Sequence, residues 1–384
     1  MKIAIFTDTY KPYVSGVTTH IGILKEGLEK RGHQVMITTV DPMVEDYVFE
    51  DNVLYCPGRA VKKIYGYGIT NPLSFHRLDI IRDFDPDVIH IQTEFAIGMF
   101  GLWASRRLKK PVVYTLHTMY DDYTDYVFPH YADKLGKSIA HRYFHVIASR
   151  ADEVIVPSKK AVQFLENCKV KRDVNFIPNV AGASECPKDK VARIKEELGL
   201  LDAEAVLCFA GRMGKEKSVD VLLAYFKELV SKHPSVRLIL VGGGPEEENL
   251  RKLAAELGIA ESVYFTGMIA HEDVTPYFYA SDLYVTASTS EMNSISMLEG
   301  MSSGLMTLQR LDESNRYQIV SGKNGWTYET ADEFIDLVDQ YLSKSPEERA
   351  VMKEDLRTYM KTYGLEQFLD KTTAVYEKVR SKRR

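Results

Sequence analysis

Short apolar runs alternate along this chain with longer segments in which apolar residues recur every three or four positions. The first run, Ile3 to Phe6, is uninterrupted, which is typical of a strand buried on both faces of a sheet. Apolar residues then recur at helical spacing from Ile21 to Leu28, and Gly32 is a typical residue at which a helix ends. The next apolar run is Val35 to Val40. This order of strand, helix and strand predicts a parallel sheet with right-handed crossover connections.

The same alternation continues through the first half of the chain and starts again in the second. The later strands of the first half are predicted at Val88 to Ile91, Val112 to Thr115 and Val154 to Val156. The strands of the second half are predicted at Ala205 to Ala210, Val236 to Val241, Val263 to Phe265 and Leu283 to Thr286. Between the halves, Asn179 to Lys188 is small, polar and without periodicity, which is typical of a linker. We therefore predict two similar α/β domains, residues 1–180 and 189–345, followed by helices in residues 346–384.

Composition narrows the class of protein. A length of 384 residues exceeds what one hydrophobic core usually organises, and a net charge of −5 argues against a general nucleic-acid binder. The four cysteines are scattered and form no CxxC pair, so we predict no zinc site and a reducing compartment. The chain opens on a strand instead of a signal peptide, and no apolar run approaches the roughly 20 residues of a membrane span. We therefore expect a cytoplasmic protein, one that can still lie on a membrane surface.

Two glutamates, Glu291 and Glu299, flank the start of a short helix that the pattern predicts in the second half and that Gly304 ends. Glu291 falls in the loop after a strand, where ligands collect in an α/β sheet. The free amides at the start of the helix would favour an anion, and they belong to Asn293, Ser294 and Ile295. Two carboxylates beside an anion site suit a nucleotide sugar, although two solvated glutamates at a helix terminus explain the spacing equally well.

Two other loops of the second half have a composition that suits phosphate. Arg212, Lys215 and Lys217 follow a strand and precede a helix, where the helix dipole opposes positive charge. Arginine offers a bidentate fork to phosphate, and lysine offers a compact point charge. The next strand runs into three glycines centred on Gly243, which allow close approach of a ligand or merely a sharp turn.

In the first half the chemistry is sparser. Gly16 lies in the loop after the first strand, but no GxGxxG is present, so a nicotinamide dinucleotide site is not predicted. His117 comes just past the carboxyl end of a strand, in the expected ligand crevice, although lone histidines are more often structural.

Three segments of the first half mix basic and aromatic residues. They are residues 59–77 with Lys62 and Lys63, the run around Arg106 and Arg107, and the helix from about Lys134 to Ser149. Such mixtures suit anionic lipid headgroups. The alternatives are a solvated loop and a helix terminus whose charges complement its dipole.

Taken together, the motifs resemble retaining glycosyltransferases of the GT4 family, in a consistent order from residue 1 to about residue 330. They are Phe6-Thr7-Asp8-Thr9-Tyr10 with Ser15-Gly16-Val17, Gly211-Arg212 with Lys215-Glu216-Lys217, Val241-Gly242-Gly243-Gly244-Pro245, Phe265-Thr266-Gly267 and Glu291-x7-Glu299. The resemblance implies the GT-B fold, in which two Rossmann-like parallel-sheet domains face each other across a cleft that holds the active site. In many members the last helix crosses back to the N-terminal domain, and we expect the same of residues 346–384.

Within the family, the opening and the segment His117 to Tyr123 look most like diacylglycerol α-glucosyltransferases of Gram-positive bacteria, which use UDP-glucose. The resemblance implies that Arg212 and Lys217 hold the donor pyrophosphate, that Glu299 binds the ribose and that Glu291 binds the transferred hexose. It places His117 beside the sugar and the acceptor, and it lets the loop at Gly16 approach the β-phosphate. The remaining donor contacts would be Gly243, Asn293, Ser294 and Ile295. Contacts to the acceptor or membrane would be Lys62, Lys63, Arg106, Arg107 and Tyr120.

The predicted reaction moves a hexose, with glucose favoured, from a UDP-sugar to the hydroxyl of diacylglycerol, with retention, at the inner face of the cell membrane. In the loops predicted to form the site no DxD-like metal box is evident, so we expect no obligatory metal, with Mg²⁺ at most stimulatory. The stretches Met292 to Ile295 and Gly304 to Met306 depart from the pattern of many relatives and leave the hexose open. The alternatives are a glycosyltransferase for a soluble or polysaccharide acceptor, a sugar-nucleotide epimerase, and a membrane-bound scaffold without turnover.

Overall fold

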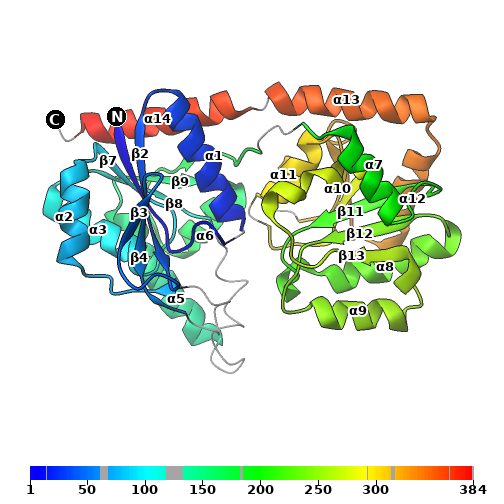
Figure 1. Cartoon of the computed structure of the whole chain (residues 1–384), viewed down its shortest axis with the longest axis horizontal. Helices are drawn as coiled ribbons and strands as arrows, with labels where there is room; N and C mark the ends of the chain where they lie inside the picture. The colour runs from blue at the N-terminus through cyan, green and yellow to red at the C-terminus, as the bar shows by residue number, and fades with distance from the viewer. Residues whose placement is uncertain are drawn as a thin grey trace. The chain divides into compact units, whose positions relative to one another are not determined.

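The computed structural model describes residues 1–13, 15–60, 68–117, 133–181, 185–291, 293–312, 316–362 and 364–382. The chain divides into two compact units, which Figure 1 shows. The first unit contains Met1–Asn179 and Leu365–Arg384, and the second contains Val180–Gly364. No helix among the described residues has both the length and the apolar content that crossing a bilayer requires.

The first unit is built on an eight-stranded sheet in the order β10-β9-β8-β7-β1-β2-β4-β3. The strands are β1 (Lys2–Phe6), β2 (Gln34–Asp41), β3 (Val48–Glu50), β4 (Val53–Pro57), β7 (Val88–Ile91), β8 (Val112–Thr115), β9 (Glu153–Val156) and β10 (Asn175–Phe176). The described ladders are parallel apart from the antiparallel pairing of β3 with β4. Ile3 to Phe6 are fully buried, as expected of a central strand covered on both faces. Two residues each in β5 (Arg59–Ala60) and β6 (Gly68–Ile69) form a separate ladder.

Helices cover this sheet, and serine side chains start three of them. The helices are α1 (Gly16–Lys30), α2 (Phe75–Phe84), α3 (Ala96–Leu108), α5 (Asp133–Arg150), α6 (Lys159–Asn167) and α14 (Leu365–Ser381). Ser15, Ser74 and Ser158 each accept a hydrogen bond from a backbone amide in the first turn of the helix that follows. Such caps satisfy donors that a helix start leaves without a partner.

The second unit has a six-stranded parallel sheet in the order β13-β12-β11-β14-β15-β16. Its strands are β11 (Val206–Ala210), β12 (Arg237–Val241), β13 (Val263–Phe265), β14 (Leu283–Thr286), β15 (Met306–Arg310) and β16 (Gly325–Tyr328). Its helices are α7 (Lys188–Glu197), α8 (Val219–Lys232), α9 (Glu247–Glu256), α10 (Thr275–Ala280), α11 (Ile295–Ser302), α12 (Ala331–Leu342) and α13 (Pro346–Thr362). Short 3₁₀ turns are η4 (Lys215–Lys217), η5 (Ala260–Ser262), η6 (His271–Asp273) and η7 (Arg316–Gln318). The prediction of two Rossmann-like units with parallel sheets is confirmed.

The C-terminal helices divide between the two units. α13 packs against α11 and β15 in the second unit, whereas α14 packs against α1, β7 and β8 in the first. A buried hydrogen-bond chain holds α14 there, because the Tyr376 hydroxyl lies 2.7 Å from Nδ1 of His90 and the Thr115 hydroxyl lies 2.7 Å from Nε2 of the same ring. The Phe368 ring also meets the His20 ring edge-on, with 5.3 Å between centroids.

Ion pairs near the end of α14 reinforce this attachment. Lys378 and Lys382 lie 2.8 and 2.7 Å from the same oxygen of Glu153, whose side chain is nearly buried. Burial alone would raise the pKa of the Glu153 carboxyl, but hydrogen bonds from both lysines and from Asn175 outweigh it and lower the pKa to about 2.

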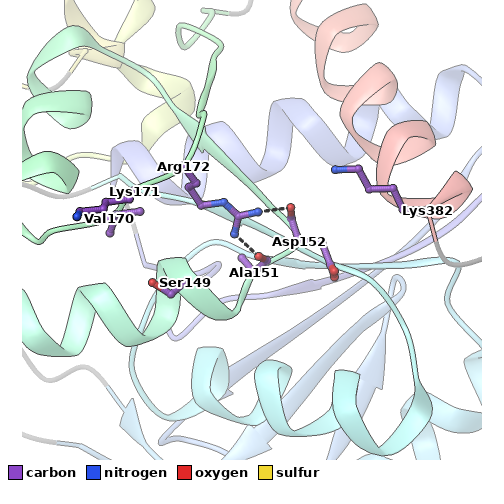
Figure 2. A pocket seen from close by; sticks show the side chains of 7 residues that line it. All are labelled: Ser149, Ala151, Asp152, Val170, Lys171, Arg172 and Lys382. Carbon is purple, nitrogen blue, oxygen red and sulfur yellow. Dashed lines mark hydrogen bonds between the residues drawn. The ribbon is translucent and has the colours of Figure 1, made fainter.

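A shallow hollow in the surface of the first unit is lined by residues that include Arg172 and Lys382. Figure 2 shows Arg172 donating to the backbone carbonyls of Ala151 and Asp152, just past the last turn of α5. The guanidinium also donates to the Ala148 carbonyl in the last turn of α5, while Lys382 is paired with Glu153. Two of the basic side chains that line the hollow, Arg172 and Lys382, are therefore held by contacts within the fold.

The two kinds of contact on α14 should differ in strength. Tyr376→Phe leaves a buried ring nitrogen of His90 without its hydroxyl partner, so we expect a loss of about 1–3 kcal/mol in the free energy of unfolding. Arg31→Ala removes ion pairs to Glu366 and Asp370, whose carboxylates are exposed, and should cost less than about 1 kcal/mol. Urea unfolding of both variants at low and moderate salt measures the difference. Equal losses would contradict the assignment of the buried chain as the main anchor.

Candidate active site

The second unit has a reversal of strand order between β11 and β14. From β11 the chain moves outward through β12 and β13, and it then returns to the other side of β11 with β14. The loops that follow β11 and β14 therefore diverge and leave a crevice at the carboxyl ends of the strands. Arg212 and Lys217 lie in the first of these loops, and Glu291 lies in the second.

Two ion pairs lie between the side chains of these loops. The Arg212 guanidinium lies 2.7 Å from Oε1 of Glu216, and Nζ of Lys217 lies 2.6 Å from Oε1 of Glu291. The Glu216 side chain is only 2% exposed, and those of Lys217 and Glu291 are mostly buried. The structure thus brings together three residues that the sequence predicted for the site, and Glu216 joins them.

Serine hydroxyls fix the spacing of the two loops. Ser288 and Ser290 donate through Oγ to the backbone carbonyl of Glu216, at 3.3 and 2.8 Å. The backbone of the η4 turn and the chain leading to Glu291 are therefore joined independently of the ion pairs. This arrangement holds the two cationic side chains in place before a ligand arrives, which is the condition for electrostatic preorganisation.

The glycine loop after β12 packs backbone against backbone on the loop after β11. The Met213 amide donates to the Gly243 carbonyl at 2.9 Å, and a Cβ added to Gly242 would lie 2.3 Å from the Gly211 carbonyl oxygen. A Cβ on Gly243 would itself meet the Met268 amide nitrogen at 3.1 Å. The glycines are therefore needed for close packing between loops, and Gly243 lies at the same edge of the sheet as Arg212.

The short helix α11 begins as predicted. Ser294 is its N-cap and accepts from the Met297 amide at 3.4 Å, Ile295 is its first residue, and Asn293 is buried just before it. Glu299 lies in the second turn, with its carboxylate 2.7 Å from Nε2 of His271 in η6. His271 was not predicted as a site residue, because its partner Glu299 lies 28 residues later in the sequence.

The first unit has a second reversal of strand order, between β1 and β7. Asp8, in the loop after β1, accepts from the Thr93 hydroxyl at 2.7 Å and from the Ile97 amide at 2.8 Å. The carboxylate thus ties the two loops together and caps the start of α3. Gly16 opens α1 on the same loop, directly after its N-cap Ser15.

His117 lies just past β8, next to the loop that follows β7. Its Nε2 is 2.5 Å from Oε1 of Gln92, and its ring meets the His20 ring edge-on at 4.5 Å between centroids. Burial, followed by the proximity of His20 and then of His90, holds the pKa of His117 well below its usual value. Burial likewise lowers the pKa of His20 to about 4 and that of His90 to about 3. The three imidazoles are therefore neutral near pH 7.

The predicted membrane contacts lie elsewhere or outside the described residues. Lys62, Lys63 and Tyr120 belong to segments that the structure does not describe. Arg106 and Arg107 are exposed in the last turn of α3. Because α3 starts at the Asp8 loop and rises about 1.5 Å per residue, they lie roughly 15 Å along the helix from that loop.

Comparisons with known proteins bear on both units. The family model described as Glycosyltransferase Family 4 matches residues 14–181, and that described as Glycosyl transferases group 1 matches residues 190–359. An alpha-monoglucosyldiacylglycerol synthase from Streptococcus pneumoniae is 36% identical over 313 residues, which cover 79% of this chain and 70% of that relative. The enzyme of that name from Acholeplasma laidlawii is 28% identical over 385 residues, which cover 98% and 96% of the two chains.

Relatives with lower sequence identity include enzymes that are named for another sugar. A GDP-mannose-dependent alpha-mannosyltransferase from Corynebacterium glutamicum is 22% identical over 80% of this chain and 72% of its own length. Among solved structures, HepE of Anabaena in complex with UDP and glucose superposes with a TM-score of 0.74 at 16% identity, covering 98% of this chain and all of that chain. At 16% identity, the similarity to HepE bears on the fold alone. With a relative at 36% identity and a family model on each unit, this chain belongs to glycosyltransferase family 4, and it is a glycosyltransferase with the GT-B fold.

Proposed function

We propose that this glycosyltransferase moves a hexose, with glucose favoured, from a UDP-sugar to the hydroxyl of diacylglycerol, with the anomeric configuration retained. The observation that carries the proposal is the two ion pairs Arg212–Glu216 and Lys217–Glu291 at the reversal of strand order in the second unit. The names of two relatives, both alpha-monoglucosyldiacylglycerol synthases, support the choice of sugar and acceptor.

The donor side follows from the charges in the second unit. The cations of Arg212 and Lys217 suit the diphosphate, whose negative charge grows as the sugar leaves. Glu291 lies beside Lys217, so one side of this pair can hold phosphate while the other holds hexose hydroxyls. Glu299 is the carboxylate for the ribose. The two cations supply the charge that a metal would otherwise provide, so we propose transfer without an obligatory metal, with Mg²⁺ at most stimulatory.

The chemical step needs no carboxylate nucleophile. The bond between the anomeric carbon and the phosphate oxygen breaks, and the acceptor hydroxyl forms its bond on the same face of the sugar. The proton of that hydroxyl passes to the leaving phosphate oxygen. Arg212 and Lys217 stabilise the diphosphate, Glu291 orients the hexose, and His117 lies on the acceptor side.

A lipid acceptor requires docking on a membrane, and the first unit has an exposed surface that suits it. The Phe75 ring meets the Trp103 ring at 5.4 Å, and the Arg107 guanidinium lies 5.6 Å above the same indole. Leu73 and Phe75 are more than half exposed. The surface formed by Leu73, Phe75, Trp103 and Arg107 is called here the aromatic patch. It joins two of the segments in which basic and aromatic residues mix, and it suits the interface of an anionic membrane. We propose that it docks at the inner face of the cell membrane.

The reaction itself is tested with vesicles that contain diacylglycerol and a panel of UDP- and GDP-sugars, with products identified by mass. We expect one hexose added to diacylglycerol with UDP-glucose as donor. Transfer from GDP-mannose would favour the activity named for the more distant relatives. Conversion of the UDP-sugar without an acceptor would indicate an epimerase and overturn the proposal.

The donor site is tested by removing its cations. Arg212→Ala and Lys217→Ala should each lower kcat/KM by a factor that corresponds to about 2–4 kcal/mol of transition-state stabilisation. Each variant lacks one positive charge that stabilises the departing diphosphate. Arg193→Ala is the matched control, since this arginine pairs with Glu197 on the surface of α7 in the same unit. Near-full turnover of both site variants, with unchanged unfolding, would show that the phosphate site lies elsewhere.

The aromatic patch is tested by binding to vesicles. Replacing Arg106 and Arg107 by Ser should weaken binding to anionic vesicles by about 2 kcal/mol at low salt, since each basic residue contributes roughly 1 kcal/mol. Phe75→Ser should weaken binding at low and high salt alike, because it removes apolar contact. Leu201→Ser, an equally exposed apolar residue of the second unit, is the control. Co-sedimentation of the arginine variant equal to that of the unchanged protein would argue against docking through this patch.

A further inference from the structure

We propose that Gln92 is a positioning residue whose side-chain carbonyl keeps the proton of the His117 imidazole on Nε2, so that Nδ1 is the hydrogen-bond acceptor of that ring. The inference deepens the proposed function, because it assigns a chemical state to the histidine on the acceptor side. It rests on a chain of polar side chains that runs from Tyr376 through His90 and Gln92, all three buried, to the partly buried His117.

The orientation of the Gln92 amide follows from its second neighbour. Its Nε2 lies 3.2 and 3.3 Å from the two ring nitrogens of His90, which is two positions earlier and on the same face of the sheet. An atom this close to both nitrogens lies over the ring face, since in the ring plane it would collide with the carbon between them. An N–H group over an aromatic face is attractive, whereas a carbonyl oxygen there would be repelled.

The two in-plane positions of His90 are already used. The hydroxyls of Tyr376 and Thr115 lie 2.7 Å from its Nδ1 and Nε2. The amide nitrogen of Gln92 therefore faces His90, and its oxygen points to His117, where it lies 2.5 Å from Nε2. A carbonyl oxygen can only accept, so Nε2 of His117 is the donor in this contact.

This arrangement leaves Nδ1 of His117 with its lone pair. Among the residues that the structure describes, no hydrogen-bond partner of that atom is found. The titratable groups that act on His117 are His20 on α1 and His90 on β7, and both disfavour a second proton on the ring. A neutral ring with a free Nδ1 can accept a hydrogen bond from a hydroxyl of the hexose or of the lipid.

Gln92→Leu and Gln92→Glu separate this role from a structural one. The tautomer is read first, by nitrogen NMR of the His117 imidazole in the protein without substrate. We expect the Nε2–H form in the unchanged protein, a mixture of tautomers in Gln92→Leu, and the doubly protonated ring near neutral pH in Gln92→Glu, where a carboxylate faces Nε2. Thr115→Val removes a hydroxyl that is hydrogen-bonded to His90, so it is the control and should leave the His117 signals in place.

Activity gives an independent reading. Gln92→Leu should lower kcat about 10–100-fold with little change in the KM for the donor, as expected for loss of a group that orients another. In a His117→Ala background the same substitution should have no further effect. The kcat of Gln92→Glu should fall as pH is lowered through neutrality, because the added carboxylate raises the pKa of His117 and protonates Nδ1.

The outcomes distinguish this inference from the proposed function. Unchanged His117 tautomers in Gln92→Leu, or an equal loss of kcat with and without His117, would overturn the positioning role whatever the acceptor is. Failure to glycosylate diacylglycerol with the expected NMR pattern intact would overturn the proposed acceptor and leave the positioning role standing. Urea unfolding of each variant identifies any loss that comes from the fold.

Discussion

The constraint on which both units depend is the reversal of strand order within a parallel sheet. A strand at the reversal has neighbours whose connections leave in opposite directions, so no crossover covers the carboxyl ends at that point. Backbone and polar groups of two loops must then be satisfied locally. In the second unit serine hydroxyls and ion pairs do this, and in the first unit the Asp8 carboxylate does it. The candidate site residues therefore lie in loops at the carboxyl ends of strands that no crossover connection covers.

The reversal in the second unit combines cations with carboxylates. In the second unit Arg212 and Lys217 are charged, and each is held by a glutamate. A buried carboxylate such as Glu216 would be costly alone, and a partner removes most of that penalty. A guanidinium has five N–H donors and an ammonium has three, so a single ion pair does not use all the donors of either group. Such pairs can therefore hold their positions and still bind phosphate.

The sequence allowed prediction of the parts of this structure that local patterns determine. The uninterrupted apolar runs of β1 and β11 and the glycine and basic loops are visible without any partner. β15 was missed because Thr307 and Gln309 interrupt its apolar residues, although both are buried in the sheet. β4 was missed because its neighbourhood is rich in glycine and charge. Contacts across long distances in sequence were also beyond reach, such as that of Tyr376 with His90, 286 residues apart. Glu216 was visible only as one residue of a basic loop, since its burial depends on the loop after β14.

The cations of the second unit and the neutral histidines of the first agree with the chemistry of the proposed retaining transfer to a lipid. The leaving diphosphate gains negative charge, so cations stabilise it. The sugar gains positive charge as it approaches an oxocarbenium ion, and the lipid hydroxyl is uncharged. A protonated imidazole near such a sugar would raise the barrier by repulsion, while a neutral one can accept a hydrogen bond. The neutral state of His20, His90 and His117 is therefore consistent with the proposed function on the acceptor side. Tyr376 of α14 is hydrogen-bonded to His90, and Gln92 contacts both His90 and His117, so the last helix of the chain is connected to the loop that carries His117.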